Sequence, residues 1–442
     1  MQRHIMPELN PGFSPEQLRA HLPIYQPQPA GTNNSVWWIG FSGGLDSTVL
    51  LHALAQLNLP VTLRALHINH QISPNADAWQ RRCEQFCVQL NLPFLAEKVQ
   101  VKNSGKGIED AAREARYNVF ERYVGANDYL FTAHHSNDQA ETLLLRLMRG
   151  TGPRGLAAIA GARKLPAGGT LIRPLLHFSR TQLEAYAHAQ QLNWVDDESN
   201  RDDHYDRNFV RNQVMPLLQT RWPVFMRKWQ QTAELCAQQE NLLEEFAQQD
   251  LARANARVER VGQSIDLLWL KSLSMARRQN LLRFWLRKAN CESPENAHWQ
   301  QLETQLFTAR EDANVDIAWG QYSLRPYQDR LFLLPVKFPG LELRFVATVA
   351  AEANVLTCLR ADLPGLKIRY RTGGERCKPV GRNHSQTLKK LLQEYPLEPW
   401  LRDQVPLVYS EDNLVAVGDL WICAGYVAAV GEAAVQLLWH RV

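Results

Sequence analysis

The first half of the chain alternates short apolar runs with longer segments whose apolar residues recur at helical spacing. Four apolar runs predict strands, at residues 36–40, 62–68, 94–99 and 129–132. Five periodic segments predict helices, at residues 46–57, 76–90, 108–124, 138–148 and 180–191. Strands that alternate with helices in this way are typical of a doubly wound α/β fold, in which helices cover both faces of a mostly parallel sheet.

The pattern changes in the second half. Residues 223–307 are rich in Gln, Glu, Ala, Leu and Arg at helical spacing, and a short β segment follows at 315–334. Beyond Pro335 and Pro339 the chain alternates Val, Leu and Ile with Gly and Pro turns, which favours a small α+β domain. We therefore expect an N-terminal extension at 1–34, an α/β domain at 35–217, a helical domain at 218–340 and an α+β domain at 341–442.

Composition narrows the class of protein. A chain of 442 residues with 45% hydrophobic and 21% charged residues predicts a soluble protein of two or three domains. No apolar run approaches the roughly 20 residues of a membrane span. Seven scattered cysteines do not form a disulfide framework, which favours a reducing cytoplasm. Residues 367–390 carry eight basic residues against one acid, a charge pattern typical of a nucleic-acid contact.

A loop of glycines and hydroxyl residues, SGGLDS at 42–47, joins the first strand to the first helix. Backbone N–H groups at a helix start favour an anion, and glycines let the backbone approach it. No Lys follows the glycines, so the loop is not a Walker A motif. Asp46 offers a ligand for a Mg²⁺ ion that bridges phosphates. The alternative is a Gly-rich turn with ordinary Ser and Asp caps.

A second polar segment, AHHSNDQAET at 133–142, follows the fourth strand. Asp138 and Glu141 are three residues apart and therefore share a helix face, where they could bind Mg²⁺ or an ammonium group. The spacing of a tightly bound zinc site is absent. The alternative is a capped helix whose acids complement the dipole. His67, at the end of the second strand, is a further candidate site residue, although a lone His at such a place is often purely structural.

Two further segments combine Arg with flexible or polar residues. Arg146, Arg149 and Arg154 flank a glycine-rich loop, which would suit an anionic substrate such as RNA or pyrophosphate. Arg207 and Arg211 follow an acidic stretch and could hold a polynucleotide backbone. A solvated, charged linker explains the latter stretch almost as well.

The order of these motifs resembles one family. The series is SGGLDS at 42–47, HINH at 67–70, EDAAREARY at 109–117, AHHSNDQAET at 133–142, RLMRGTGPRGL at 146–156, IRPLL at 172–176, the segment 197–212, RTGGER at 371–376, LK at 388–389 and WLR at 400–402. It resembles the tRNA(Ile)-lysidine synthetases, bacterial PP-loop ATP pyrophosphatases, over nearly the whole chain. The family uses ATP to adenylate the wobble cytidine of an isoleucine tRNA with a CAU anticodon. Free L-lysine then displaces AMP at C2 of that cytidine.

The resemblance implies a role for each candidate residue. Nucleotide binding falls to Ser42, Gly43, Gly44, Leu45, Asp46, Ser47 and His67, with Asp46 also holding Mg²⁺. Asp46, Asp138 and Glu141 would be catalytic, the last two by holding the lysine. Contacts to tRNA fall to Arg146, Arg149, Arg154, Arg207, Arg211, Arg371, Arg376 and Lys389. Dimerisation is common in the family, so a homodimer is compatible with this interpretation.

Three other functions are compatible with parts of the sequence. A PP-loop enzyme that thiolates tRNA is the nearest, but those enzymes commonly use a cysteine pair, and the chain has no Cys-x-x-Cys. A non-catalytic RNA-binding protein would tolerate loss of Asp46. An amidating synthetase for small molecules would not need the residues after about 342.

Overall fold

The computed structural model describes residues 12–23, 35–101, 107–198, 202–307, 315–351 and 357–441. The chain divides into two compact units, Met1–Leu242 and Leu243–Val442. The expected extension at 1–34 lies partly outside the described residues. The division into four domains at 34, 217 and 340 stays a prediction. None of the helices among the described residues combines the length and apolar composition of a membrane span.

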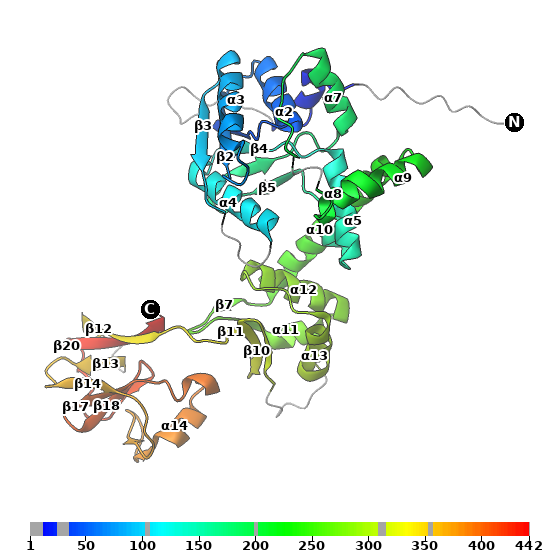
Figure 1. The fold of residues 1–442 in the computed structure, drawn as a ribbon. Coiled ribbons are helices and arrows are strands. Elements are labelled where there is room, and N and C mark those ends of the chain that lie inside the picture. The colour runs from blue at the N-terminus through cyan, green and yellow to red at the C-terminus, as the bar shows by residue number, and fades with distance from the viewer. Residues whose placement is uncertain are drawn as a thin grey trace. The chain divides into compact units, whose positions relative to one another are not determined.

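The first unit is built on a six-stranded sheet in the order β3-β2-β1-β4-β6-β5 (Figure 1). The strands are β1 (Val36–Gly40), β2 (Thr62–Asn69), β3 (Phe94–Lys98), β4 (Tyr129–Phe131), β5 (Ala162–Lys164) and β6 (Thr170–Ile172). All neighbours are parallel except β5, which pairs antiparallel with β6. The mostly parallel sheet is thereby confirmed. Strands β5 and β6 were not predicted: β5 is mostly polar and exposed along its length, and β6 has only two apolar residues, so neither shows the apolar run that marks β4.

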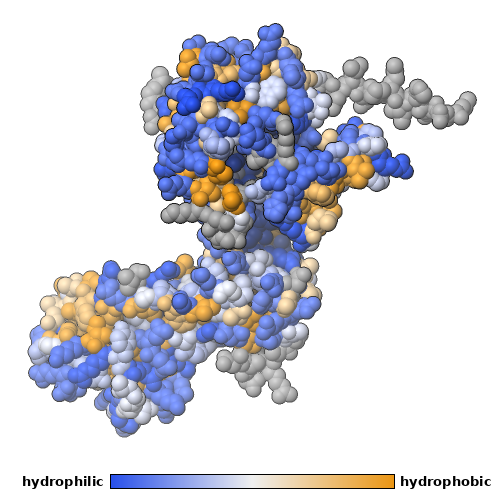
Figure 2. Space-filling model, in the orientation of Figure 1, coloured by the Kyte–Doolittle hydropathy of each residue, from blue (hydrophilic) through white to orange (hydrophobic). Residues whose placement is uncertain are grey.

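Helices follow the strands closely as the sequence predicts. They are α1 (Pro15–Arg19), α2 (Leu45–Gln56), α3 (Ala76–Gln89), α4 (Ile108–Tyr123), α5 (Ser136–Met148), α6 (Pro153–Leu156), α7 (Arg180–Ala189), α8 (Asp206–Phe209), the π-helix η2 (Val210–Val214) and α9 (Met215–Arg221). Apolar side chains reach the surface on and just after α9, where Leu217, Trp222 and Val224 are more than half exposed (Figure 2).

Both faces of the sheet are buried, and adjacent residues of β1 show why. Trp37 and Ile39 belong to a core shared with α2, α3 and α7, whereas Trp38 belongs to a second core formed with α4. Side chains alternate across a strand, so a strand with helices on both faces must be apolar throughout. Phe13 and Leu18, from the described part of the N-terminal extension, are buried in the first core.

The order of the strands places a crevice beside β1. The chain passes from β1 to β2 and β3 on one side, and then returns to β4 on the other side of β1. In open α/β sheets, ligands bind beyond the carboxyl ends of the strands at such a switch point. The SGGLDS loop follows β1 and the AHHSNDQAET segment follows β4, so both lie at this crevice.

The second unit begins within α10 (Phe225–Arg253), a helix of 29 residues. Its first part contains α11 (Leu267–Ser272), α12 (Met275–Lys288) and α13 (Asn296–Phe307). These helices pack with a five-stranded antiparallel sheet of β7 (Arg257–Val258), β8 (Gln263–Asp266), β11 (Arg330–Pro335), β10 (Tyr322–Tyr327) and β9 (Ile317–Trp319). The expectation of a helical region closed by one β segment missed β7 and β8.

The end of the chain is an α+β arrangement, as predicted. A three-stranded sheet joins β12 (Leu341–Val349), β20 (Ala433–Arg441) and β13 (Cys358–Arg360). A four-stranded sheet joins β14 (Leu366–Arg369), β17 (Leu407–Ser410), β18 (Asn413–Val417) and β19 (Trp421–Ile422). The pair β15 (Arg376–Cys377) and β16 (Gln386–Thr387), helix α14 (Leu388–Glu394) and the short 3₁₀ turn η4 (Pro399–Leu401) complete it.

Candidate active site

The SGGLDS loop forms the start of α2, and its own hydroxyl groups hold its shape. Ser42 Oγ lies 3.0 Å from Ser47 Oγ and accepts a hydrogen bond from the Gly44 N–H (3.3 Å). Thr48 Oγ1 donates to the Gly44 carbonyl (2.9 Å), as does Ser47 Oγ (3.0 Å). Gly44 is the N-cap and supplies no side chain to the first turn of α2. The N–H groups of that turn have no intrahelical acceptors and are therefore available to an anion.

Only glycine fits at position 43, because of both the backbone conformation there and the space around it. The φ angle of Gly43 is +85°, in the left-handed region that side chains rarely adopt. A Cβ atom there would lie 2.6 Å from Cys83 Sγ, and the Gly43 carbonyl accepts a hydrogen bond from the Val195 N–H (2.9 Å). The loop therefore packs between α3 and the segment that follows α7.

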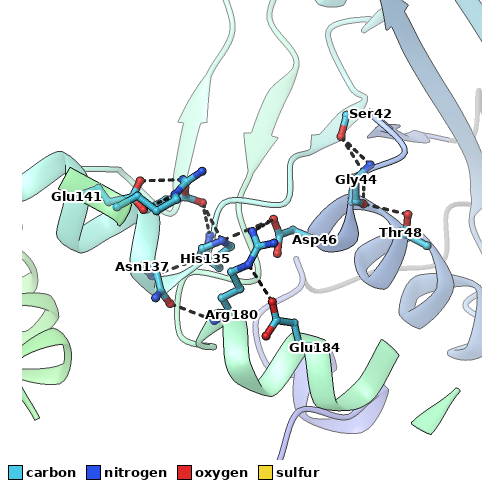
Figure 3. Close-up of polar contacts among 12 residues, drawn as sticks. Ser42, Gly44, Asp46, Thr48, His135, Asn137, Glu141, Arg180 and Glu184 are labelled. Carbon is cyan, nitrogen blue, oxygen red and sulfur yellow. Dashed lines mark hydrogen bonds and ion pairs between the residues drawn. The ribbon is translucent and has the colours of Figure 1, made fainter. Parts of the chain in front are cut away.

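His135 connects the loop to the start of α5. Its Nε2 lies 3.6 Å from Asp46 Oδ2 (Figure 3). The same atom lies 3.5 Å from Asp138 Oδ2. Its Nδ1 accepts a hydrogen bond from the Asn137 N–H (3.2 Å), so the hydrogen-bond network assigns the proton to Nε2. Burial disfavours the imidazolium, but the carboxylates of Asp138 and Asp46 outweigh it and raise the pKa of His135. His135 Nε2 therefore carries a proton and faces the carboxylates of both Asp46 and Asp138.

Arg180 brings a third element to Asp46. Its Nη1 lies 3.6 Å from Asp46 Oδ2, and its Nε donates to Glu184 Oε1 (3.1 Å). The backbone N–H of Arg180 donates to Asn137 Oδ1 (3.0 Å), which ties the start of α7 to the start of α5 (Figure 3). Asp46 is thus the meeting point of α2, α5 and α7.

Asp138 and Glu141 pair with Arg207 and Arg211. Arg207 donates from Nη2 to Asp138 (3.0 Å) and from Nε to Glu141 (3.0 Å). Arg211 donates from Nε to Glu141 (2.7 Å) and from Nη2 to both acids (3.1 and 2.8 Å). The Glu141 side chain is only 1% exposed, whereas those of the two arginines are 26% and 29% exposed. Two candidate sites that the sequence treats separately are therefore one cluster of four charges.

The charges of this cluster set the protonation of its members. Burial raises the pKa of Asp138, but His135, Arg207 and the other nearby cations lower it by more. The pKa of Asp138 is therefore well below its usual value. His134 shows the opposite balance. Burial, together with the guanidinium groups of Arg173 and Arg207, lowers the pKa of His134 to about 3, although Asp138 acts against them. At neutral pH the site therefore holds an ionised Asp138 and a neutral His134.

The remaining predicted residues lie outside the cluster of four charges. His67 is buried and its Nδ1 contacts the Phe41 carbonyl (2.9 Å), at the end of β1. Arg146 donates to the carbonyls of Gly155 and Ala158 and so holds the α5–α6 turn. Arg149 and Arg154 are exposed beside it. Arg371, Arg376 and Lys389 belong to the second unit, where Arg371 and Arg376 donate to backbone carbonyls and Lys389 is exposed.

Sequence reasoning did not select His135, Asn137 or Arg180 as site residues. His135 and Asn137 stand inside the AHHSNDQAET segment, so their motif was available as a signal. Arg180 stands more than forty residues after Asn137 and has no local motif that points to Asp46. Only the fold brings it to the site.

One carboxylate oxygen suits a divalent cation. Asp46 Oδ1 is buried and has no hydrogen-bond partner among the described residues, while Oδ2 faces His135 and Arg180. A hard cation such as Mg²⁺ prefers carboxylate oxygen and keeps phosphate oxygens and waters as its other ligands. Within the described part of the chain, no group of three or more His, Cys, Asp or Glu residues could hold a metal. Asp46 Oδ1 would therefore fit Mg²⁺ as a single protein ligand, because the described residues offer no cage of protein ligands.

The parallel sheet, the lysine-free loop and the acidic helix start define a PP-loop nucleotide-binding protein, and residues 17–218 match the PP-loop domain family model. Residues 266–332 match the TilS substrate binding domain, and residues 366–439 match the TilS substrate C-terminal domain. Three curated relatives are named tRNA(Ile)-lysidine synthase. The Coxiella burnetii protein is 36% identical and covers 94% of both chains. The Serratia proteamaculans protein is 40% identical over 91% of this chain and 95% of its own, and the Escherichia coli O157:H7 protein is 38% identical over 91% and 96%.

Identity at this level, over almost the full length of each relative, shows that the chain belongs to the tRNA(Ile)-lysidine synthase family. The resemblance drawn from the motifs is confirmed, and with it the use of ATP by a PP-loop domain.

Proposed function

We propose that this protein joins free L-lysine to C2 of the wobble cytidine in an isoleucine tRNA with a CAU anticodon, at the expense of ATP. Family membership supports the reaction class and the tRNA substrate. The observation that carries the assignment to this site is the 3.6 Å approach of Asp46 to His135. It joins a phosphate-binding helix start to a helix start rich in carboxylates, and the reaction needs both an anion site and an ammonium site.

In the first step, the O2 atom of the cytosine attacks the α-phosphorus of ATP and pyrophosphate leaves. We assign the phosphates to the N–H groups at the start of α2 and to the hydroxyls of Ser42 and Ser47. Preorganised donors of this kind stabilise the charge that develops on the phosphate oxygens. Mg²⁺, held by Asp46, would neutralise phosphate charge. Arg180 and His135 keep Asp46 oriented through Oδ2, which leaves Oδ1 for that role.

In the second step, the lysine ε-amine attacks C2 and AMP leaves with the former cytosine oxygen. Asp138 and Glu141 are the groups we assign to the lysine, by charge-assisted hydrogen bonds to an ammonium group. Their oxygens already accept hydrogen bonds from Arg207 and Arg211. The ammonium group of the lysine would therefore take the place of the Arg207 or Arg211 guanidinium. The amine attacks only when neutral, and the carboxylate that binds it is also an acceptor for its proton.

Binding of the tRNA falls to the basic residues. Arg149 and Arg154 are exposed beside α5, and Arg207 and Arg211, once released from the acids, would be free to bind RNA phosphates. Arg371, Arg376 and Lys389 would bind the RNA from the second unit. A homodimer and a cytoplasmic location stay predictions.

The proposal is tested by following all products in one reaction with ATP, lysine and a CAU-anticodon isoleucine tRNA transcript. AMP, pyrophosphate and RNA-linked lysine should form in equal amounts. Without lysine, pyrophosphate should still be released in a burst that depends on tRNA. The burst should stop when about one pyrophosphate has been released for each enzyme-bound tRNA. Transfer of sulfur from a sulfur donor, with no dependence on lysine, would instead support the thiolation alternative, which family membership does not favour.

A further inference from the structure

A groove of about 930 Å³ lies in the second unit, where the connection from β11 to β12 meets the turn around η4. Its lining includes three aromatic rings and two cations, namely Phe338, Tyr370, Trp400, Arg325 and Lys337. Part of this lining comes from the WLR motif, which the proposed chemistry does not use. Aromatic faces beside positive charge are the combination that single-stranded nucleic acid requires.

The ring of Trp400 is held in place from behind. Its centroid lies 5.1 Å from that of Phe332 and 6.0 Å from that of Tyr327, both in edge-to-face geometry. Tyr327 is fixed in turn, because its hydroxyl donates to the Leu397 carbonyl (3.1 Å). Trp400 itself is half-buried, so it remains in part accessible from the groove. A ring that is already immobilised loses little entropy when a base stacks on it.

Tyr370 is the second platform, and the hydrophobic core does not explain its position. Its side chain is 57% exposed, although it stands directly after β14 and before Arg371. An exposed aromatic ring that lines a groove can stack on a base together with a half-buried ring such as that of Trp400.

The groove has a net positive charge from Lys337, because Arg325 and Asp403, which also line it, each pair with a residue of opposite charge. Arg325 lies with its Cζ 5.8 Å from the Trp400 ring centroid, and it pairs through Nη2 with Asp316 (2.8 Å). Lys337 also lines the groove and is exposed. The acid on the rim, Asp403, is neutralised because Arg371 Nη1 donates to it (2.8 Å). Phosphate is therefore favoured next to the aromatic rings.

We propose that this groove binds an unpaired nucleotide of the tRNA, with its base against Trp400 and Tyr370 and its phosphate at Arg325 and Lys337. The nucleotide must be unpaired, because neighbouring pairs cover both faces of a base in a duplex. This inference rests on the proposed tRNA substrate, but it does not depend on the lysine chemistry. The other source of the same chemistry is a free mononucleotide, which the test separates.

The test uses the full-length protein with Tyr370→Ala and Lys337→Ala combined. Both side chains are exposed, so their removal should leave the fold intact and weaker binding would not result from misfolding. The matched control combines Leu268→Ala and Lys271→Ala on α11, which also removes one exposed apolar side chain and one charge. Binding of a tRNA transcript and of a short single-stranded RNA is measured without ATP or lysine. The groove variant should bind both about tenfold more weakly, since one stacked base contributes on that order. The control should stay within about twofold of the wild type.

Equal weakening in the groove variant and the control, or no weakening in the groove variant, would overturn the proposal. Displacement of the short RNA by AMP at equal concentration would reassign the groove to a free mononucleotide. In lysine ligation, the KM for tRNA of the groove variant should rise by about the same tenfold factor. A wild-type protein that binds RNA in the groove but ligates no lysine would refute the proposed function and leave this inference intact.

Discussion

Glu141 Oε1 and Arg211 Nε lie 2.7 Å apart, although seventy positions separate the two residues in the chain. The Glu141 side chain is almost completely buried, whereas that of Arg211 is partly exposed. The Glu141 carboxylate is thus fixed in α5. A ligand could approach it from the side on which Arg211 lies. This asymmetry makes Glu141 the anchor of the charged cluster and Arg211 its exchangeable member.

Glu141→Gln should loosen α5 locally. Removing one partner of a buried ion pair leaves the other charges uncompensated, which costs about 3 kcal/mol. Hydrogen exchange of the α5 amides measures this as a lower free energy of opening. The control is Glu184→Gln, because the Arg180–Glu184 pair is exposed on both sides and should contribute less than about 0.5 kcal/mol. Equal protection of α5 in both variants would refute the role of the buried pair.

The same Glu141→Gln protein should bind lysine poorly if the proposed function is correct. Loss of one charge-assisted hydrogen bond of about 1.5–3 kcal/mol raises the KM for lysine by about one to two orders of magnitude. The KM for ATP should change little, because the nucleotide loop belongs to α2. A change in the KM for ATP alone would contradict the assignment of Glu141 to lysine.

Asp46→Asn should reduce kcat by about 10²–10³-fold, in the range of losses seen when a group that stabilises transition-state charge is removed. The amide keeps the size of the side chain, and its oxygen can still face the Arg180 guanidinium. The fold should therefore persist, as circular dichroism can check. Restored activity at high Mg²⁺ concentration would indicate that Asp46 only raises metal affinity, and unchanged activity would exclude a role in phosphate chemistry.

Gly43→Ala should destabilise the loop by about 1–3 kcal/mol, since a φ of +85° is strained for alanine and the new Cβ meets Cys83 Sγ. The double variant Gly43→Ala, Cys83→Ala relieves the contact but not the strain. Chemical unfolding should therefore show partial recovery. Full recovery would mean that the contact alone matters, and no loss in the single variant would contradict the described loop.

His134 should contribute to acid sensitivity. Its pKa is about 3 in the folded protein and about 6.5 in the unfolded chain, so below pH 6.5 the unfolded state binds more protons. Stability from this group is therefore complete above pH 6.5 and falls as the pH falls, by at most about 1.4 kcal/mol per pH unit.

His134→Gln should flatten the loss of stability between pH 6.5 and 4.5. It should not abolish it, because burial also lowers the pKa of His70, to about 4, with the same sign. Urea unfolding of both proteins across this range gives the two slopes. Identical slopes would contradict a neutral His134 in the folded site.

The sequence predicts much of the first unit because its signals are local. β1 and the SGGLDS loop follow from a buried strand, a glycine turn and a helix start, which adjacent residues encode. The pairing of Arg207 with Asp138 depends on strand order and on the path of the chain after α7, so no local pattern contains it. Both pairs of charges were recognised as candidates, but their meeting was not. Strands of two or three residues, such as β5 and β7, are fixed by pairing partners rather than by a period of their own.

The most direct test of the account is the incorporation of labelled lysine into two isoleucine tRNA transcripts that differ only at the wobble position, with C in one and U in the other. ATP-dependent label on the first alone, with release of AMP, is the predicted result, because the chemistry requires C2 of that cytidine. Label on both transcripts, or on neither while AMP is still formed, would contradict lysine ligation at the wobble cytidine as the function of this site.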